Sequence, residues 1–206
     1  MVKSAFQTDL GKNLANYQAL TPLNFLQRAA GVYPEHTAWI HGQDSVNYRE
    51  FGLRCRRLGS ALAGRGIGVG DTVAVMAPNV PALLEAHYGV PMVGAVLNAI
   101  NVRLDAPTIA FILKHGEAKL LISDREYSSI VSDAIAAMDD PPPVIDIDDA
   151  LYEGSGDLLG EIDYEAFLGG GDPTYEISGP SDEWDAVALN YTSGTTGNPK
   201  GVVYHH

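Results

Sequence analysis

The chain has 206 residues, 46% of them hydrophobic and 19% charged, and its formal net charge is −13. This length and composition fit a globular protein of one domain, or of one domain and part of a second. The negative charge makes nucleic acid and anionic membrane surfaces poor partners, because their phosphates would be repelled.

Cysteine usage and the N-terminus indicate the compartment. Cys55 is the only cysteine, so a disulfide within the chain is excluded, which fits a reducing environment. The N-terminal residues lack the apolar core of a signal peptide, and the longest apolar-leaning run, residues 90–100, is too short to span a bilayer. We therefore expect a soluble, cytoplasmic protein.

The first predicted elements are a hairpin and a long helix. Two short extended pieces surround a polar turn at residues 42–45. Asn47 precedes Glu50 by three positions, which resembles a capping box and predicts a helix that runs to about Ala63. Its cysteine falls on the apolar face and is expected to be a core thiol. That face carries Phe51, Cys55, Leu58 and Leu62.

From residue 71 onward, short apolar runs alternate with helical patterns. The runs are continuous, which indicates strands buried on both faces of a mostly parallel sheet. The sequence therefore predicts an α/β fold with helices on both faces of the sheet. Residues 150–184 interrupt this order with a Gly- and acid-rich excursion that has one short helix near 164–168. The predicted strands are 71–79, 94–101, 118–124, 142–149 and 184–190, and the predicted helices are 81–89, 107–116 and 125–138.

The last predicted strand runs directly into the loop "YTSGTTGNPKG" (191–201). Ligands of open parallel sheets gather beyond the carboxyl ends of the strands. Glycines let the backbone approach a bulky anion, hydroxyls donate to phosphate oxygens, and a Lys adds a point charge. The residues that would do this are Thr192, Ser193, Gly194, Thr195, Thr196, Gly197 and Lys200. Lys200 is also the only Lys or Arg after Arg125, while the stretch between them is rich in Asp and Glu.

Three common nucleotide or catalytic motifs are absent from the sequence. Lys200 follows Pro199 and precedes an apolar run that reads as a strand, so the loop is not the P-loop of kinases and GTPases. The glycines of "GRGIGVGD" (64–71) lack dinucleotide-binding spacing and precede a strand, which indicates a helix-to-strand turn. No G-x-S-x-G elbow is present. Composition alone still leaves a plain solvent loop open at 191–201.

The ordered string "YTSGTTGNPKGV" (191–202) resembles, nearly residue for residue, the phosphate-binding signature of the adenylate-forming superfamily. This superfamily includes acyl-CoA synthetases, aryl-CoA ligases, luciferases and the adenylation domains of peptide synthetases. Residues 21–51 look like the start of such an enzyme, and residues 69–124 are similar to the fatty and aryl acyl-CoA synthetase branch. The resemblance is weakest at 140–183.

The resemblance implies an ATP-dependent acyl-CoA ligase. A carboxylic acid, fatty or aryl, would attack the α-phosphate of ATP and give an acyl-adenylate and pyrophosphate, and coenzyme A would then take the acyl group. Thr192, Ser193, Gly194, Thr195, Thr196 and Gly197 would wrap the β- and γ-phosphates, and Lys200 would neutralise the leaving pyrophosphate. Thr192 would also help to hold Mg²⁺.

The resemblance also implies that residues 1–206 are the N-terminal portion of the large, AMP-binding domain. The acyl pocket, an acidic Mg²⁺ ligand, a ribose-binding Asp and the small C-terminal domain with its catalytic Lys have no counterpart here. We therefore expect no catalytic residue in this segment and no turnover by the 206-residue chain alone.

Two other readings stay open. One is a catalytically silent nucleotide-binding or assembly module. The other is a fragment that does not fold independently and associates through an exposed strand edge and apolar surface near 186–204. Association of two copies of the chain into a homodimer also stays open. The histidines receive no functional role: His41, His87 and His115 are assigned to the surface or to packing, and His36, His205 and His206 stay unassigned. An oxidoreductase would need the dinucleotide fingerprint that the chain lacks.

Overall fold

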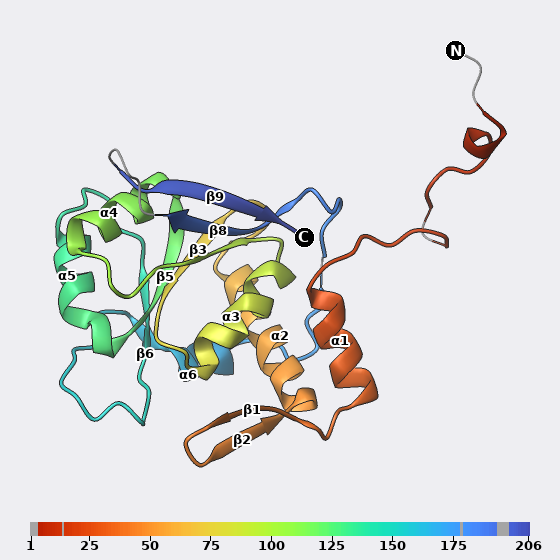
Figure 1. The fold of residues 1–206 in the computed structure, drawn as a ribbon. Coiled ribbons are helices and arrows are strands. Elements are labelled where there is room, and N and C mark those ends of the chain that lie inside the picture. Colours follow the sequence, from red (N-terminus) through yellow and green to blue (C-terminus); the bar gives the residue numbers. More distant parts are fainter. Residues whose placement is uncertain (1–3, 14, 178, 193–197) are drawn as a thin grey trace.

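A seven-stranded sheet forms the centre of the computed structural model, which describes residues 4–13, 15–177, 179–192 and 198–206 (Figure 1). Its strand order is β7-β6-β5-β3-β4-β8-β9. Every neighbouring pair is parallel except β8 and β9, which are antiparallel. The α/β fold with a mostly parallel sheet is therefore confirmed.

The sheet strands are short, and the central ones are mostly buried. All five residues of β3 are buried, as are all four of β6. This explains why their sequences show no alternation: both faces of the sheet are covered by helices. The strands are β3 (Thr72–Met76), β4 (Val96–Ala99), β5 (Ala118–Asp124), β6 (Val144–Ile147), β7 (Ile162–Asp163), β8 (Ala186–Thr192) and β9 (Lys200–His205). A separate antiparallel hairpin consists of β1 (Thr37–His41) and β2 (Asp44–Asn47), as predicted.

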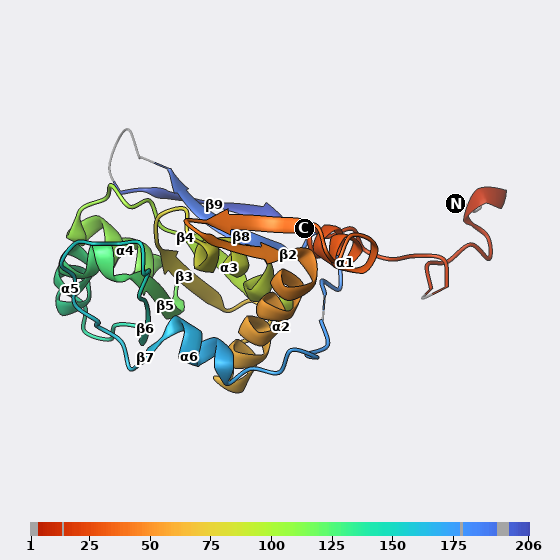
Figure 2. The same cartoon turned by 90° about the horizontal axis from the view of Figure 1, so that it is seen from below.

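Helices cover the two faces in separate groups (Figures 1 and 2). One core packs α2, α3 and α6 against the sheet, and a second core packs α4 and α5 against the opposite face. A third, smaller core joins α1 to α2. The helices are α1 (Leu23–Val32), α2 (Tyr48–Gly64), α3 (Pro81–Met92), α4 (Ala106–His115), α5 (Ser128–Ala136) and α6 (Tyr164–Gly169), with short 3₁₀ turns η1 (Ala5–Gln7) and η2 (Arg125–Tyr127). None of the helices in the described part of the chain is long and apolar enough to cross a membrane.

The start and buried face of α2 are as the sequence predicts. The Asn47 side chain accepts a hydrogen bond from the Glu50 N–H at 2.9 Å, which satisfies one free donor at the helix start. Cys55 is fully buried between α1 and α2, and burial raises the pKa of its thiol well above the usual range. The core assignment of this thiol is therefore confirmed.

Four features differ from the predicted elements. Helix α3 continues past Gly89 and Pro91 to Met92, where the sequence suggested an end near Gly89. Helix packing accounts for the glycine inside α3. A Cβ at Gly89 would lie 2.6 Å from Leu58 Cδ2, so its absence lets α2 and α3 approach each other. The predicted helix 125–138 is divided into η2 and α5. Helix α1 and the two-residue β7 were not predicted. The turn at 64–71 is confirmed, with Gly70 at φ +82°.

A buried ion-pair network joins α2, α3 and α6. Arg54 Nε donates to Glu85 Oε1 at 2.5 Å, and Arg54 Nη2 donates to Glu85 Oε2 at 3.2 Å. Tyr164 Oη donates to Glu85 Oε2 at 2.9 Å, and Arg54 also binds the exposed Glu165. The Glu85 side chain is 0% exposed, so its charge depends on these partners.

Candidate functional site

The site predicted from the sequence lies on the hairpin of β8 and β9, at one end of the sheet (Figure 1). β8 runs parallel to β4, and residues 193–199 follow its carboxyl end. β9 returns antiparallel, and Thr192 and Lys200 form the last pair of the ladder. The run of Val202, Val203 and Tyr204 fits the pleat because β-branched and aromatic residues favour strands.

The structure brings two of the predicted site residues together. Thr192 and Lys200 lie opposite each other at the mouth of the hairpin, and both are exposed. The other five, Ser193, Gly194, Thr195, Thr196 and Gly197, fall outside the described residues. The described part of the site is therefore a hydroxyl and a cation on adjacent strand ends.

Lys200 is available to a ligand. In the residues that the structure describes, its ammonium group forms no ion pair. An exposed, unpaired ammonium next to a hydroxyl suits a phosphate, which takes a point charge and hydrogen-bond donors. Across the described ranges, no group of three or more His, Cys, Asp or Glu side chains is placed to hold a metal ion.

The residue before Thr192 is anchored to another helix. The Tyr191 hydroxyl lies 2.7 Å from His115 Nδ1, at the last residue of α4, although the two are 76 residues apart. The Tyr191 side chain is partly buried against the core on that face of the sheet. Burial raises the pKa of its phenol. His115 was expected to lie at the surface or in packing, and the sequence carried no signal that it would meet Tyr191.

The chain-terminal histidines also have partners. His206 Nδ1 lies 2.8 Å from the Thr21 hydroxyl at the start of α1, and burial lowers the pKa of His206. The His205 ring stacks on Trp184, with ring centroids 4.2 Å apart. These contacts tie β9 to segments distant in sequence, so they support the hairpin from its other end.

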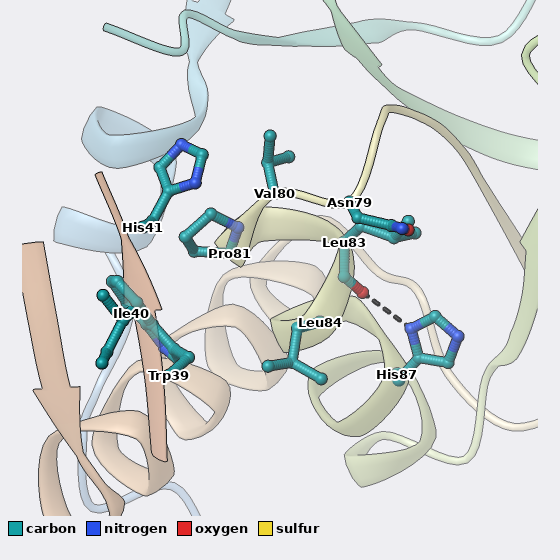
Figure 3. A pocket seen from close by; sticks show the side chains of 9 residues that line it. All are labelled: Trp39, Ile40, His41, Asn79, Val80, Pro81, Leu83, Leu84 and His87. Atoms are coloured by element: carbon teal, nitrogen blue, oxygen red, sulfur yellow. Dashed lines mark hydrogen bonds between the residues drawn. The ribbon is translucent and has the colours of Figure 1, made fainter. Parts of the chain in front are cut away.

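A cavity of about 340 Å³ lies away from this hairpin, between β1 and the start of α3 (Figure 3). His41 and His87 lie on opposite sides of it. His41 Nε2 is held at 3.0 Å from both carboxylate oxygens of Asp149, and His87 Nδ1 lies 2.7 Å from the Leu83 carbonyl oxygen. Both rings therefore already have structural partners, which agrees with their assignment to the surface or to packing. The remaining lining is mostly apolar: Trp39, Ile40, Asn79, Val80, Pro81, Leu83 and Leu84.

Comparison with known proteins identifies the family. Residues 26–206 match the family described as AMP-binding enzyme. The chain belongs to the AMP-binding enzyme family. It is 50% identical to the peroxisomal acetate/butyrate–CoA ligase of Arabidopsis thaliana and 47% identical to an acetate–CoA ligase of Humulus lupulus, each over 96% of this chain. These similarities cover 37% of each relative, so the chain spans little more than a third of their length.

Solved structures agree with this placement. The anthranilate CoA ligase in complex with anthranoyl-AMP has a TM-score of 0.80 over 89% of this chain and 34% of that chain, at 24% identity, which shows the fold. The N-terminal domain of a Mycobacterium tuberculosis protein, FACL13, has a TM-score of 0.73 at 30% identity, over 89% of this chain and 44% of that chain. The adenylate-forming resemblance noted in the sequence is therefore confirmed.

Proposed function

We propose that the protein to which this chain belongs is an ATP-dependent acyl-CoA ligase, and that residues 1–206 form the N-terminal portion of its AMP-binding domain. The proposal rests on one structural observation: Thr192 lies opposite Lys200 in the last pair of the β8–β9 ladder, and Lys200 forms no ion pair with the residues that the structure describes. The 50% and 47% identity to two named CoA ligases supports the same reaction. The reaction converts a carboxylic acid and ATP to an acyl-adenylate and pyrophosphate, and then, with coenzyme A, to an acyl-CoA and AMP.

The roles follow from charge and position. Thr192, Ser193, Gly194, Thr195, Thr196 and Gly197 would donate hydrogen bonds to the β- and γ-phosphate oxygens. Lys200 would place its ammonium against the pyrophosphate as negative charge develops on it, which stabilises the transition state. Thr192 would offer its hydroxyl to Mg²⁺, which would supply further neutralisation of the phosphates.

The names of the relatives reduce the range of candidate acid substrates. The sequence favoured a fatty or aryl acid, and two of the most similar proteins are named for acetate or butyrate. A relative at 43% identity, from Petunia hybrida, is named for trans-cinnamate. We therefore place short-chain aliphatic acids first and aryl acids second. The cytoplasmic location and the homodimer stay predictions, and several of the relatives carry "peroxisomal" in their names.

Pyrophosphate exchange tests the proposal. The full-length protein is incubated with ATP, Mg²⁺, labelled pyrophosphate and acetate, butyrate or cinnamate. Lys200→Ala should lower the exchange rate by about 100-fold, the scale for losing one preorganised charge or donor at a phosphoryl or acyl centre. Lys114→Ala is the matched control, because Lys114 is an exposed Lys on α4 and not part of the proposed site.

Each outcome has a defined meaning. Exchange that is lost in Lys200→Ala and kept in Lys114→Ala supports the ligase and the role of Lys200. Equal exchange in both variants would contradict the role of Lys200. Absence of exchange in the folded wild-type protein with every acid would contradict the ligase and leave the silent nucleotide-binding or assembly module.

A further inference from the structure

Among the residues that the structure describes, the carboxyl end of β8 has no registered ladder pair with β4. In the described residues, the ladder between β4 and β8 consists of one registered pair, Leu97 with Ala188. Beyond that pair, the backbone ladder of β8 in the described part of the chain runs to β9, which lies at the edge of this sheet. The backbone ladder therefore fixes Thr192 and Lys200 relative to each other but not relative to the main body of the sheet.

One side chain supplies the missing connection. Tyr191, next to Thr192, reaches α4 through the 2.7 Å hydrogen bond between its hydroxyl and His115 Nδ1. The His115 ring also meets the Tyr191 ring edge-on, with centroids 5.7 Å apart, and stacks on Phe111 one turn earlier, with centroids 5.1 Å apart. His115 is thus held by its own helix and presents one nitrogen to the tyrosine.

Two glycines leave the space that Tyr191 occupies. A Cβ at Gly116 would lie 3.2 Å from the Tyr191 hydroxyl oxygen and 3.2 Å from Leu189 Cδ2. A Cβ at Gly201, across the hairpin, would lie 3.0 Å from Leu189 Cδ1 and 3.6 Å from the Tyr191 ring. The distances of 3.0–3.2 Å are tighter than ordinary packing and the 3.6 Å distance is ordinary contact, so a side chain at Gly116 would crowd Tyr191 and one at Gly201 would crowd Leu189.

We propose that Tyr191 and His115 are positioning residues that fix Thr192 and Lys200 against the α4 end of the molecule for the triphosphate of ATP. This inference rests on the proposed function for its ligand, but the anchoring itself does not. The pair acts through the strand end, and neither side chain is assigned a contact with the substrate. Loss of the anchor should therefore weaken ATP binding more than it slows the chemical step.

The kinetic test uses the full-length protein. Tyr191→Phe keeps the ring and removes the hydroxyl, and it should raise KM for ATP about five- to tenfold with a smaller change in kcat. His115→Phe should do the same, while His115→Gln, which keeps a polar group near the tyrosine, should restore most of the loss. The double variant Tyr191→Phe/His115→Phe should be no worse than either single variant, because both remove one interaction. Tyr204→Phe is the matched control, since Tyr204 lies exposed on β9 of the same hairpin.

A second measurement is independent of catalysis. Amide hydrogen exchange of the full-length protein should be faster over residues 188–192 and 200–203 in Tyr191→Phe than in Tyr204→Phe, while the exchange rate in β3 and β5 stays unchanged. The proposed anchor would be wrong if Tyr191→Phe left amide hydrogen exchange in the β8–β9 hairpin unchanged, or if its KM for ATP equalled that of Tyr204→Phe. If the folded wild-type protein shows no exchange of pyrophosphate, the proposed ligase is wrong, and the hydrogen-exchange result still decides the anchor.

Discussion

The buried Arg54–Glu85 pair offers the most direct test of the packing between α2, α3 and α6. Arg54→Met keeps an unbranched apolar side chain on α2 and removes the cation. Glu85 is 0% exposed and would then be left with only the Tyr164 hydroxyl as a hydrogen-bond donor among the side chains that now contact it. Removing one partner of a buried pair costs about 3–5 kcal/mol of folding free energy, because the remaining charge is uncompensated.

A matched control lies one turn further along α2. Arg57 pairs with Glu50 at 2.9 Å, but these side chains are 31% and 44% exposed. Arg57→Met should therefore cost about 0–1 kcal/mol, the range for solvent-exposed pairs. The double variant Arg54→Met/Glu85→Gln should recover more than half of the folding free energy that Arg54→Met loses. The Gln amide at position 85 carries no charge, and its oxygen can still accept the hydrogen bond from the Tyr164 hydroxyl.

The assay is urea unfolding of the 206-residue chain followed by circular dichroism, at pH 7 and pH 5. Burial raises the pKa of the Glu85 carboxyl, and Arg54 opposes this. Without Arg54 the folded-state pKa rises further above the unfolded value, so the variant loses stability as pH increases through that range. The Arg54→Met loss should be smaller at pH 5 than at pH 7. A loss below about 1 kcal/mol at pH 7, or one equal to that of Arg57→Met, would refute the reasoning.

Two further predictions concern glycine packing and pH. Gly89→Ala should destabilise the chain by about 1–3 kcal/mol in the same urea assay, because its Cβ would overlap Leu58. Gly64→Ala, at the end of α2 with nothing within 4 Å of the added Cβ, should be neutral or stabilising, and equal losses in both would contradict this account. Burial lowers the folded-state pKa of His206 below its ordinary 6.5, so the unfolded chain gains that proton first and stability falls as pH drops below about 6.5. His206→Gln should flatten the dependence of unfolding free energy on pH between about 6.5 and 5.5, and an unchanged slope would show that His206 does not contribute.

Much of the fold follows from local sequence signals. The helix that begins after Asn47 is marked by its cap and its apolar spacing, and the strand 118–124 has the predicted bounds. These signals are local because a cap and a continuous apolar run act within a few residues. The end of α3 could not be predicted in this way, since the packing of Gly89 against Leu58 overrides the helix-ending tendency of Gly and Pro.

For the candidate site, too, some features could be predicted from the sequence and others only from the tertiary structure. The string at 191–202 carried the resemblance to the family, which the match over residues 26–206 confirms, and it named the residues proposed to bind phosphate. Only the tertiary structure decided that His115 meets Tyr191 and that Arg54 meets Glu85. These contacts join residues on different elements, and their partners are chosen by how helices pack on the sheet, which no local pattern encodes.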